Sequence, residues 1–595
     1  MFGVGLAADR LGVGTISADL SGPNGYKLHR DWQIAVRPAH APITLAQTAL
    51  QAPGETFRLD PHQLGLFLPG SLVISVGYAG YAGIDAPSLL QSLYEYPFGC
   101  TEQLVSAAWP LIYFNDPDLL GRVPRDAGAR AKVQHAIDTI IDREDPAGRF
   151  GLWHVGDGQA SPWLDAYAVD FLMHARDGGF TVPDPALDRA EGWLAQEVQQ
   201  ADPYADDRFG PTQAASRAYG LYVLARAGRG DLGAMRRMHD TVTWSKAGTN
   251  GSRLISWGEG GAKHGFAEAL GLAHLAGALS LMGDRARAHD TFGMAIANLG
   301  AHRRVPAAWF DFTYWSYVRD LAGVVAIAAD SGENDLAQSL IDRFGRLDLT
   351  APRLNTQEKA ALLAAAHALN RDEPGRALAV NGRQIAPLKL PAALAPTAAE
   401  VQAGYAVTNS GSTDLWRTVM LTGSPATALP ALAAGYTLDR RYFTLDGKPA
   451  DPSHLRQNDR LIVALSGAAQ DDDNHRTVLV DLLPAGWEIE TPIRSEDQYP
   501  FLGALTHARV TEARDDRFVT AFDLGADLAG DQDREVDDDK KAGRAPLKAA
   551  QFRVAYVVRV VTPGHFARPE AVVDDMYRPQ IMARTDSGET VADPR

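Results

Sequence analysis

The sequence of 595 residues contains a single cysteine. One cysteine excludes an intrachain disulfide and any metal or iron–sulfur site built from several thiolates. Basic residues are also outnumbered, because 57 Lys and Arg against 73 Asp and Glu leave a formal net charge of −16. A protein that binds nucleic acid shows a basic surface instead, so we expect no nucleic-acid partner.

Long apolar runs are absent too. No stretch reaches the roughly 18 apolar residues of a membrane-spanning helix, and the N-terminal segment lacks the basic start and apolar core of a signal peptide. His154 and His264 lie in glycine-rich segments, but neither has a second histidine at metal-binding spacing. We therefore expect neither a metal site nor another cofactor.

The composition is that of a folded protein. Hydrophobic residues make up 46% of the chain and charged residues 22%, which provides ample apolar material for packed cores. At roughly 100–200 residues per domain, the length predicts about three to five domains.

The pattern along the chain changes twice. Short runs rich in β-formers, broken by Gly and Pro, predict strands at 30–38, 41–50, 55–60 and 71–81. From about 94 to 372, apolar residues recur with the helical period, and several segments end in Gly, as at 175–179 and 328–332. Helix pairs recur at roughly 50-residue intervals, which favours an α/α array closed into a ring. Strand patterns resume from about 376, so the order β–α–β predicts a multidomain α+β chain with a helical domain inserted into a β domain.

The single cysteine lies in the segment YEYPFGCTEQLVSAAWPLIYF, 94–114. Pro97 and Gly99 predict a turn, after which Cys100 opens a helix. The i, i+3 spacing puts Cys100 and Gln103 on one helix face. A thiolate there can attack the Gln103 side-chain carbonyl and expel ammonia, which leaves an internal thioester. The helix N-terminus is expected to favour the thiolate, and an apolar cover must keep water from the ester.

Other interpretations of these residues are open at this point. A lone cysteine is often a small buried apolar residue, and the segment can then belong to a non-covalent adhesion or structural module. Alternatively, Cys100 is the nucleophile of a hydrolase with a distant histidine as base. Asp165, Asp170 and Glu259 also permit a carbohydrate-active enzyme, which needs two carboxylates facing across a cleft.

The motif Y-P-F-G-C-T-E-Q at 96–103 resembles the thioester motif of the α2-macroglobulin and complement family, particularly its bacterial members. Segments 436–463, 480–490 and 561–588 resemble the last macroglobulin domain of the bacterial proteins. The resemblance implies an α/α toroid, the thioester domain, inserted in a CUB-like β-sandwich domain and followed by a C-terminal macroglobulin-type β-sandwich. The implied boundaries are the end of a macroglobulin-like domain at 1–37, the CUB-like domain at 38–93 and 375–430, the toroid at 94–374, and the C-terminal sandwich at 431–595.

The same resemblance implies the site residues. Cys100 and Gln103 carry the thioester, and Tyr96, Gly99 and Glu102 form its environment. Met576 and Tyr577, in the segment DDMYRPQ, match the positions that shield the ester. Some complement members steer the ester towards hydroxyl groups with a histidine. Segment 202–220, where we would expect that residue, contains none, which favours amine targets.

The implied function is that of a broad-spectrum protease inhibitor, which is not an enzyme. A protease cleaves a bait region, the cover leaves, and a lysine amine of the protease is acylated by Gln103 in a single turnover. The expected partners are therefore target proteases, bound covalently by a monomer. Bacterial members are much longer, so we expect this chain to match their C-terminal third, without the bait region. The family implies a periplasmic location, with inner-membrane attachment only through a lipidated N-terminus that this chain does not contain.

Overall fold

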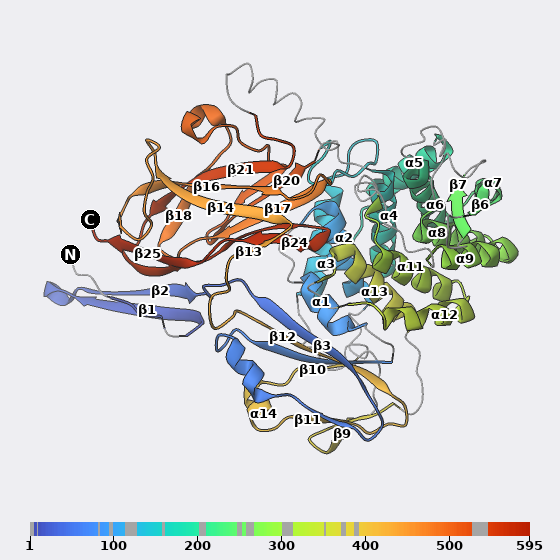
Figure 1. Ribbon diagram of the computed structural model, residues 1–595, viewed down its shortest axis with the longest axis horizontal. Helices are drawn as coiled ribbons and strands as arrows, with labels where there is room; N and C mark the ends of the chain where they lie inside the picture. The colour runs from blue at the N-terminus through green and yellow to red at the C-terminus, as the bar shows by residue number, and fades with distance from the viewer. Residues whose placement is uncertain are drawn as a thin grey trace.

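The computed structural model describes residues 5–8, 10–80, 84–94, 99–113, 128–157, 161–200, 210–246, 253–257, 267–299, 313–349, 353–369, 376–385, 392–525 and 546–595. Helices and strands occupy separate blocks of the molecule (Figure 1). A β-hairpin forms an arm at one side and is made of β1 (Gly12–Ser21) and β2 (Lys27–Val36) in antiparallel register. Most side chains of this arm are exposed.

Two small sheets below the arm combine strands from both sides of the helical block. One sheet has the order β10-β5-β12-β3, with bounds Ala392–Leu394, Val73–Ala79, Leu415–Gly423 and Ile43–Gln51. The other has the order β4-β11-β8-β9, with bounds Thr56–Arg58, Ala406–Asn409, Leu378–Val380 and Arg383–Ile385. Apolar side chains of the two sheets share one core, which includes Val76, Val407 and Leu421. The helices are therefore inserted between the strands of one β unit.

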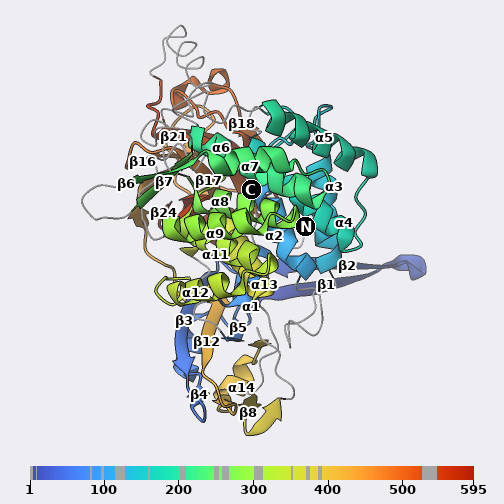
Figure 2. The ribbon, with the colours of Figure 1, turned by 90° about the vertical axis from the view of Figure 1, so that its right-hand side faces the viewer.

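The helical block is a double ring. Its inner helices contact one another in chain order, and the last contacts the first: α2 (Thr101–Tyr113), α4 (Pro162–Asp177), α6 (Gly210–Arg226), α8 (Ala269–Leu281), α11 (Tyr317–Asp330) and α13 (Thr356–Ala368). The outer helices pack against them: α1 (Ala86–Tyr94), α3 (Ala129–Ile141), α5 (Asp184–Gln200), α7 (Leu232–Asp240), α9 (Arg285–Leu299) and α12 (Asn334–Phe344). Figure 2 looks onto this block, with the hairpin of β6 (Val242–Lys246) and β7 (Arg253–Trp257) at its rim. Inner helices such as α8 are buried all round, as expected for helices enclosed by others.

The predicted helix ends are confirmed at several glycines. Gly179, Gly228 and Gly332 adopt φ of +76°, +74° and +81° after α4, α6 and α11. This left-handed conformation closes the last turn of a helix and costs glycine little. The start of the helical block differs from the predicted residue 94, because α1 begins at Ala86 and packs on α2 and α13. The helix has only nine residues, and so short an apolar run does not reveal its period.

The C-terminal block stacks β-sheets. The larger has the order β13-β24-β23-β17-β20-β19, with bounds Leu432–Ala434, Arg578–Arg584, Ala571–Asp575, His475–Leu482, Arg517–Leu524 and Val510–Ala513. The next has the order β14-β16-β21-β18, with bounds Tyr436–Thr444, Arg460–Ala469, Gln551–Val560 and Trp487–Ile493. A third pairs β15 (Leu455–Arg456), β25 (Gly588–Asp593) and β22 (Gly564–Arg568). A shared core holds them together, with Leu479, Phe518 and Val558 fully buried or nearly so.

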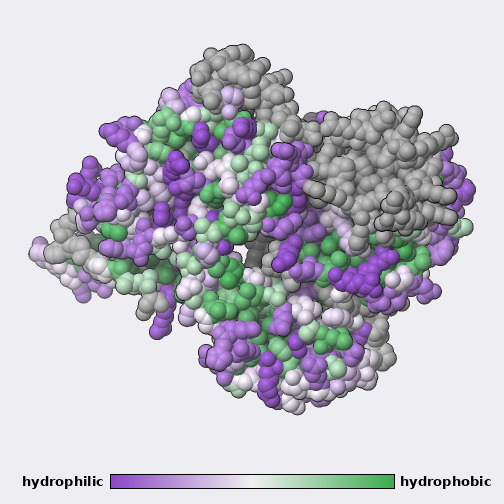
Figure 3. Space-filling model, viewed as in Figure 1, coloured by the Kyte–Doolittle hydropathy of each residue, from purple (hydrophilic) through white to green (hydrophobic). Residues whose placement is uncertain are grey.

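The predicted fold class is confirmed: a mixed chain with a closed helical ring and several β-sandwich sheets. On the face in Figure 3, hydrophilic residues spread over the rims and hydrophobic residues gather towards the centre. Among the described helices, none is long and apolar enough to cross a membrane.

Candidate functional site: a buried Cys–Gln pair beneath a turn of the C-terminal sandwich

Cys100 immediately precedes helix α2. Its carbonyl accepts the N–H of Leu104 at 2.9 Å, so it stands at the N-cap of the helix. The Gln103 side chain folds back over this first turn, and its Oε1 accepts the N–H of Cys100 at 3.3 Å. Both side chains are buried, with exposed fractions of 0% and 1%. The structure therefore brings Cys100 and Gln103 together, as the i, i+3 spacing predicts.

The loop around the cysteine is tied to the segment that follows α3. Thr101 donates its N–H to the carbonyl of Leu152 at 2.7 Å and its hydroxyl to the carbonyl of Gly151 at 2.6 Å. The guanidinium of Arg143 donates to the carbonyls of Gly99 at 2.7 Å and Leu152 at 3.1 Å. The Thr101 N–H is one of the groups that helix initiation leaves without an intrahelical partner, and the Leu152 carbonyl satisfies it. Arg143 was not predicted, because an arginine near a helix end gives no local signal for this contact.

The cover comes from the other end of the chain. Met576 and Tyr577 form the turn between β23 and β24, and both are buried. Met576 Sδ lies 3.5 Å from Gln103 Nε2, and Tyr577 Oη lies 3.9 Å from Cys100 Sγ. The structure thus places both predicted shield residues over the pair. Tyr96 lies outside the described residues.

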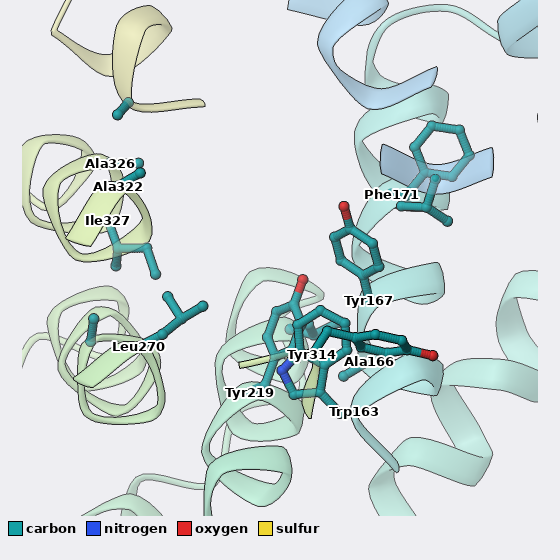
Figure 4. Close-up of a cluster of buried hydrophobic side chains, with 14 of the residues drawn as sticks. Trp163, Ala166, Tyr167, Phe171, Tyr219, Leu270, Tyr314, Ala322, Ala326 and Ile327 are labelled. Carbon is teal, nitrogen blue, oxygen red and sulfur yellow. The ribbon is translucent and has the colours of Figure 1, made fainter. Parts of the chain in front are cut away.

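Two further residues, missed in the sequence, hold Tyr577 in place. Asn355, the N-cap of α13, donates its side-chain N–H to the Tyr577 carbonyl at 3.0 Å. The Tyr314 ring packs against the Tyr577 ring with centroids 5.0 Å apart, and against Trp163 at 5.4 Å (Figure 4). Tyr314 has φ of +54°, which is rare for a bulky residue. The turn that carries the cover thus packs against an aromatic side chain of the helical block, which is itself backed by Trp163.

The turn itself is held by a buried carboxylate. Asp575 Oδ1 accepts the N–H groups of Tyr577 at 2.9 Å and Arg578 at 3.0 Å. Its Oδ2 contacts His475 Nδ1 at 2.9 Å, and His475 Nε2 contacts Asp471 at 2.8 Å. Charge-assisted bonds of this kind are the stronger ones, so they fix how the turn presents its side chains.

Glu102 is a buried carboxylate beside the pair. Its Oε1 accepts hydrogen bonds from Ser106 at 2.6 Å and Gln357 at 2.9 Å, and the Thr356 hydroxyl lies 3.0 Å from both of its oxygens. Its Oε2 accepts the Tyr577 hydroxyl at 3.0 Å. Burial raises the pKa of Glu102, although these donors oppose the shift.

The helix N-terminus does not make the cysteine acidic, contrary to the prediction. Burial raises the pKa of the Cys100 thiol to about 12, and the Glu102 carboxylate raises it further. Removal of a charged sulfur from water outweighs the favourable backbone groups of the helix start. A cavity of about 10 Å³ adjoins Cys100, which is roughly the space of one water molecule. Leu152, Trp153, Arg476 and Phe522 are among the residues that line it.

The other candidate residues do not form a second site of the predicted kinds. Asp165 and Asp170 lie on one helix, α4, and both are buried. Asp165 accepts bonds from the Phe150 N–H and the Trp193 indole, while Asp170 pairs with Arg226 at 2.5 Å. They do not face each other across a cleft, as a glycosidase requires.

His154 is exposed, with Nδ1 3.3 Å from the Val155 carbonyl. Glu259, His264 and residues 202–209 of the 202–220 segment lie outside the described residues. Among the described side chains, no group of three or more His, Cys, Asp or Glu is arranged to hold a metal ion.

Two family models match the chain. The model described as the A-macroglobulin TED domain matches residues 75–213, and that of the bacterial alpha-2-macroglobulin MG10 domain matches residues 435–527. Among curated proteins, alpha-2-macroglobulin of Escherichia coli is 29% identical over 581 residues, which cover 93% of this chain and 32% of that protein. Alpha-2-macroglobulin of Xylella fastidiosa (strain Temecula1) is 28% identical over 94% of this chain and 33% of its own length. The chain therefore spans about a third of the curated relatives it matches.

Solved structures agree with these matches. Native Escherichia coli alpha-2-macroglobulin, spanning domain MG7 to the C-terminus, superposes with a TM-score of 0.79 at 26% identity, covering 99% of this chain and 88% of that one. Salmonella alpha-2-macroglobulin reacted with methylamine gives a TM-score of 0.78 at 27% identity, over 99% of this chain and 36% of that one. The likeness thus extends through the helical ring, the flanking sheets and the C-terminal sandwich. By domain matches, relatives and fold together, the chain is an alpha-2-macroglobulin-like C-terminal region of the bacterial type.

Proposed function

We propose that Cys100 Sγ and the Gln103 side-chain carbonyl form an internal thioester that acylates an amine once the cover has moved away. The observation that carries this proposal is the burial of the two side chains on one helical turn, directly beneath Met576 and Tyr577. A thioester hydrolyses in water, so a site that stores one must be dry until it is used. The cover belongs to a different domain, so its removal requires only a movement between domains.

The surroundings of Cys100 argue against a cysteine hydrolase. In the described part of the chain, the Cys100 thiol has its polar contact with the Tyr577 hydroxyl, where a hydrolase needs a histidine base. A pKa raised to about 12 is also the reverse of what a catalytic thiolate requires. The geometry therefore favours acyl storage over repeated turnover.

For the whole protein we propose covalent trapping of proteases. A cleaved bait region elsewhere in the molecule would release the cover, and a lysine amine of the protease would take the acyl group from Cys100. This capture is single-turnover and makes the protein an inhibitor, not an enzyme. The Salmonella relative, whose structure was solved after reaction with methylamine, supports an amine as the nucleophile. We further propose a monomer in the periplasm, attached to the inner membrane through a lipidated N-terminus.

The intact mass of the freshly purified protein tests the thioester. We expect a mass lower than the sequence mass by one ammonia, with no free thiol. Methylamine should add its own mass and release one thiol. Cys100→Ser is the matched control and should show the full sequence mass with and without methylamine. A wild-type protein with the full mass and a free thiol from the start would contradict the proposal.

A further inference from the structure

The hydroxyl of Tyr577 contacts both the Glu102 carboxylate and the Cys100 sulfur. It donates a hydrogen bond to Glu102 Oε2 at 3.0 Å and lies 3.9 Å from Cys100 Sγ. A polar group at this point is therefore within reach of both the carboxylate and the proposed ester. An incoming nucleophile must approach the Gln103 carbonyl carbon, which the ester joins to Cys100 Sγ, to within roughly 3–3.5 Å, and this brings it close to the place of the Tyr577 hydroxyl.

The two oxygens of Glu102 differ in where their partners come from. Oε1 is held by Ser106 of α2 and Gln357 of α13, both in the helical ring. Oε2 shares the Thr356 hydroxyl with Oε1 and is otherwise bonded to Tyr577, in the C-terminal sandwich. When the sandwich moves away, the ring keeps Glu102 in position and Oε2 loses the Tyr577 hydroxyl. A buried carboxylate oxygen then faces the ester with room for a new donor.

We propose that Glu102 is the general base of the acyl transfer, and that Tyr577 holds the place of the nucleophile until the cover opens. This inference rests on the proposed thioester and adds a catalytic residue to it. A lysine reaches the site as an ammonium ion, which cannot attack until it loses a proton. Once the cover has opened, the ammonium occupies the place of the Tyr577 hydroxyl. Glu102 Oε2, which accepts that hydroxyl in the closed site, is then placed to take the proton.

The ammonium donates one proton to Glu102 Oε2, and the freed nitrogen lone pair attacks Gln103 Cδ. The N–C bond forms and the C–S bond breaks, with its electron pair going to Cys100 Sγ. The second nitrogen proton passes to this thiolate, which gives the thiol and a neutral amide. Glu102 then releases its proton to solvent.

Two nucleophiles separate a base from a merely structural residue. Methylamine must lose protons to form an amide, whereas 2-mercaptoethanesulfonate attacks as a thiolate and needs no base. We would measure both rates by intact mass in a Tyr577→Ala background, where the cover hydroxyl is gone. Adding Glu102→Gln should slow methylamine addition by about 10²-fold or more. The thiolate rate should stay unchanged. Glu191→Gln, a buried glutamate of outer helix α5, is the matched control and should change neither rate.

Each outcome decides the inference. Equal slowing of both nucleophiles would mean that Glu102 only shapes the site, and no slowing would mean that it is idle; either result overturns the proposal. If Glu102→Gln prevents ester formation, the Tyr577→Ala protein alone still tests the general base. Its reaction with methylamine should be slower in heavy water than in ordinary water, whereas its reaction with the thiolate should not. Equal rates in heavy and ordinary water would then contradict a general base. Absence of the ammonia-deficient mass in wild type would overturn the proposed function itself, which the rate ratio does not address.

Discussion

At the scale of single residues, Gly151 lies at a tight point beneath the site. Its carbonyl accepts the Thr101 hydroxyl at 2.6 Å, and Thr101 follows Cys100 directly. A Cβ added at residue 151 would lie 1.9 Å from the carbonyl oxygen of His154. The backbone cannot move away from that contact as a flexible side chain would, so the loop must shift. This shift disturbs the hydrogen bond between Thr101 and the Gly151 carbonyl.

We therefore expect Gly151→Ala to shorten the life of the proposed ester. The strain should lower the free energy of unfolding by about 1–3 kcal/mol, as for other over-packed sites. Intact mass followed over time measures the ester, and urea unfolding measures the stability. Gly293→Ala is the control, because this exposed glycine of α9 has no atom near its added Cβ. That change should raise helix stability by about 0.5–1 kcal/mol and leave the ester unaffected. An ester of normal lifetime in Gly151→Ala would show that the loop does not hold Thr101.

At the scale of elements, the turn between β23 and β24 acts as a unit. Asp575 accepts two backbone N–H groups of the turn and also contacts His475. Asp471 supports the same network from its outer end and is half exposed. Asp575 therefore supports the turn directly, whereas Asp471 supports it only through His475.

Replacing these carboxylates should open the cover to different degrees. Asp575→Ala leaves the turn N–H groups buried without their acceptor, at a cost of about 1–3 kcal/mol each. We expect methylamine to react at least about tenfold faster, since 1.4 kcal/mol corresponds to a factor of ten. Asp471→Ala removes only the outer support of His475 and should have a smaller effect. Equal rates in both variants and wild type, read as thiol release, would show that the turn is held by other contacts.

The elements also show what the sequence could predict. Helix periods and glycine stops depend on local geometry, and so does the i, i+3 approach of Gln103 to Cys100. The contacts of Glu102 with Thr356 and Gln357 join residues 254 and 255 positions apart. Only closure of the ring, which puts α13 beside α2, creates them. Met576 and Tyr577 were predicted through the family resemblance alone, because no local pattern in the segment around them indicates that it packs over Cys100.

At the scale of the whole molecule, the helical ring encloses ionisable groups whose pKa values shift in opposite directions. Burial raises the pKa of Asp165 from 3.8 to about 8, helped by the nearby Glu197 carboxylate. Asp170, on the same helix, has a pKa lowered to about 2; its burial opposes this shift, and Arg226 is the main cause. Burial lowers the pKa of His274 from 6.5 to about 3. Each shift makes the free energy of unfolding depend on pH between the unfolded and the folded pKa of that group.

The sign of each contribution follows from proton binding. Between pH 3.8 and 8, folded Asp165 keeps a proton that the unfolded chain loses, so stability falls as pH rises. Between pH 3 and 6.5, the unfolded chain protonates His274 while the folded ring does not, so stability rises with pH. The two slopes oppose each other up to pH 6.5, where the His274 contribution ends. Above that, the Asp165 slope of roughly 1.4 kcal/mol per pH unit stands without it.

We therefore expect the free energy of unfolding of the ring to fall between pH 6.5 and 8, and Asp165→Asn to flatten that fall. The amide keeps an acceptor for the Phe150 N–H but loses the Trp193 bond, so it costs some stability at low pH. Asp170→Asn, further along α4, should leave the alkaline slope intact. It should remove the pH dependence between about pH 2 and 3.8 and lower stability by a constant amount at all higher pH, because the ion pair with Arg226 is lost. Urea unfolding at a series of pH values separates the two. If Asp165→Asn kept the wild-type slope above pH 6.5, the protons released on unfolding would have to come from other buried acids of the ring. Glu268 and Glu197, with pKa values raised to about 7, are the next to replace.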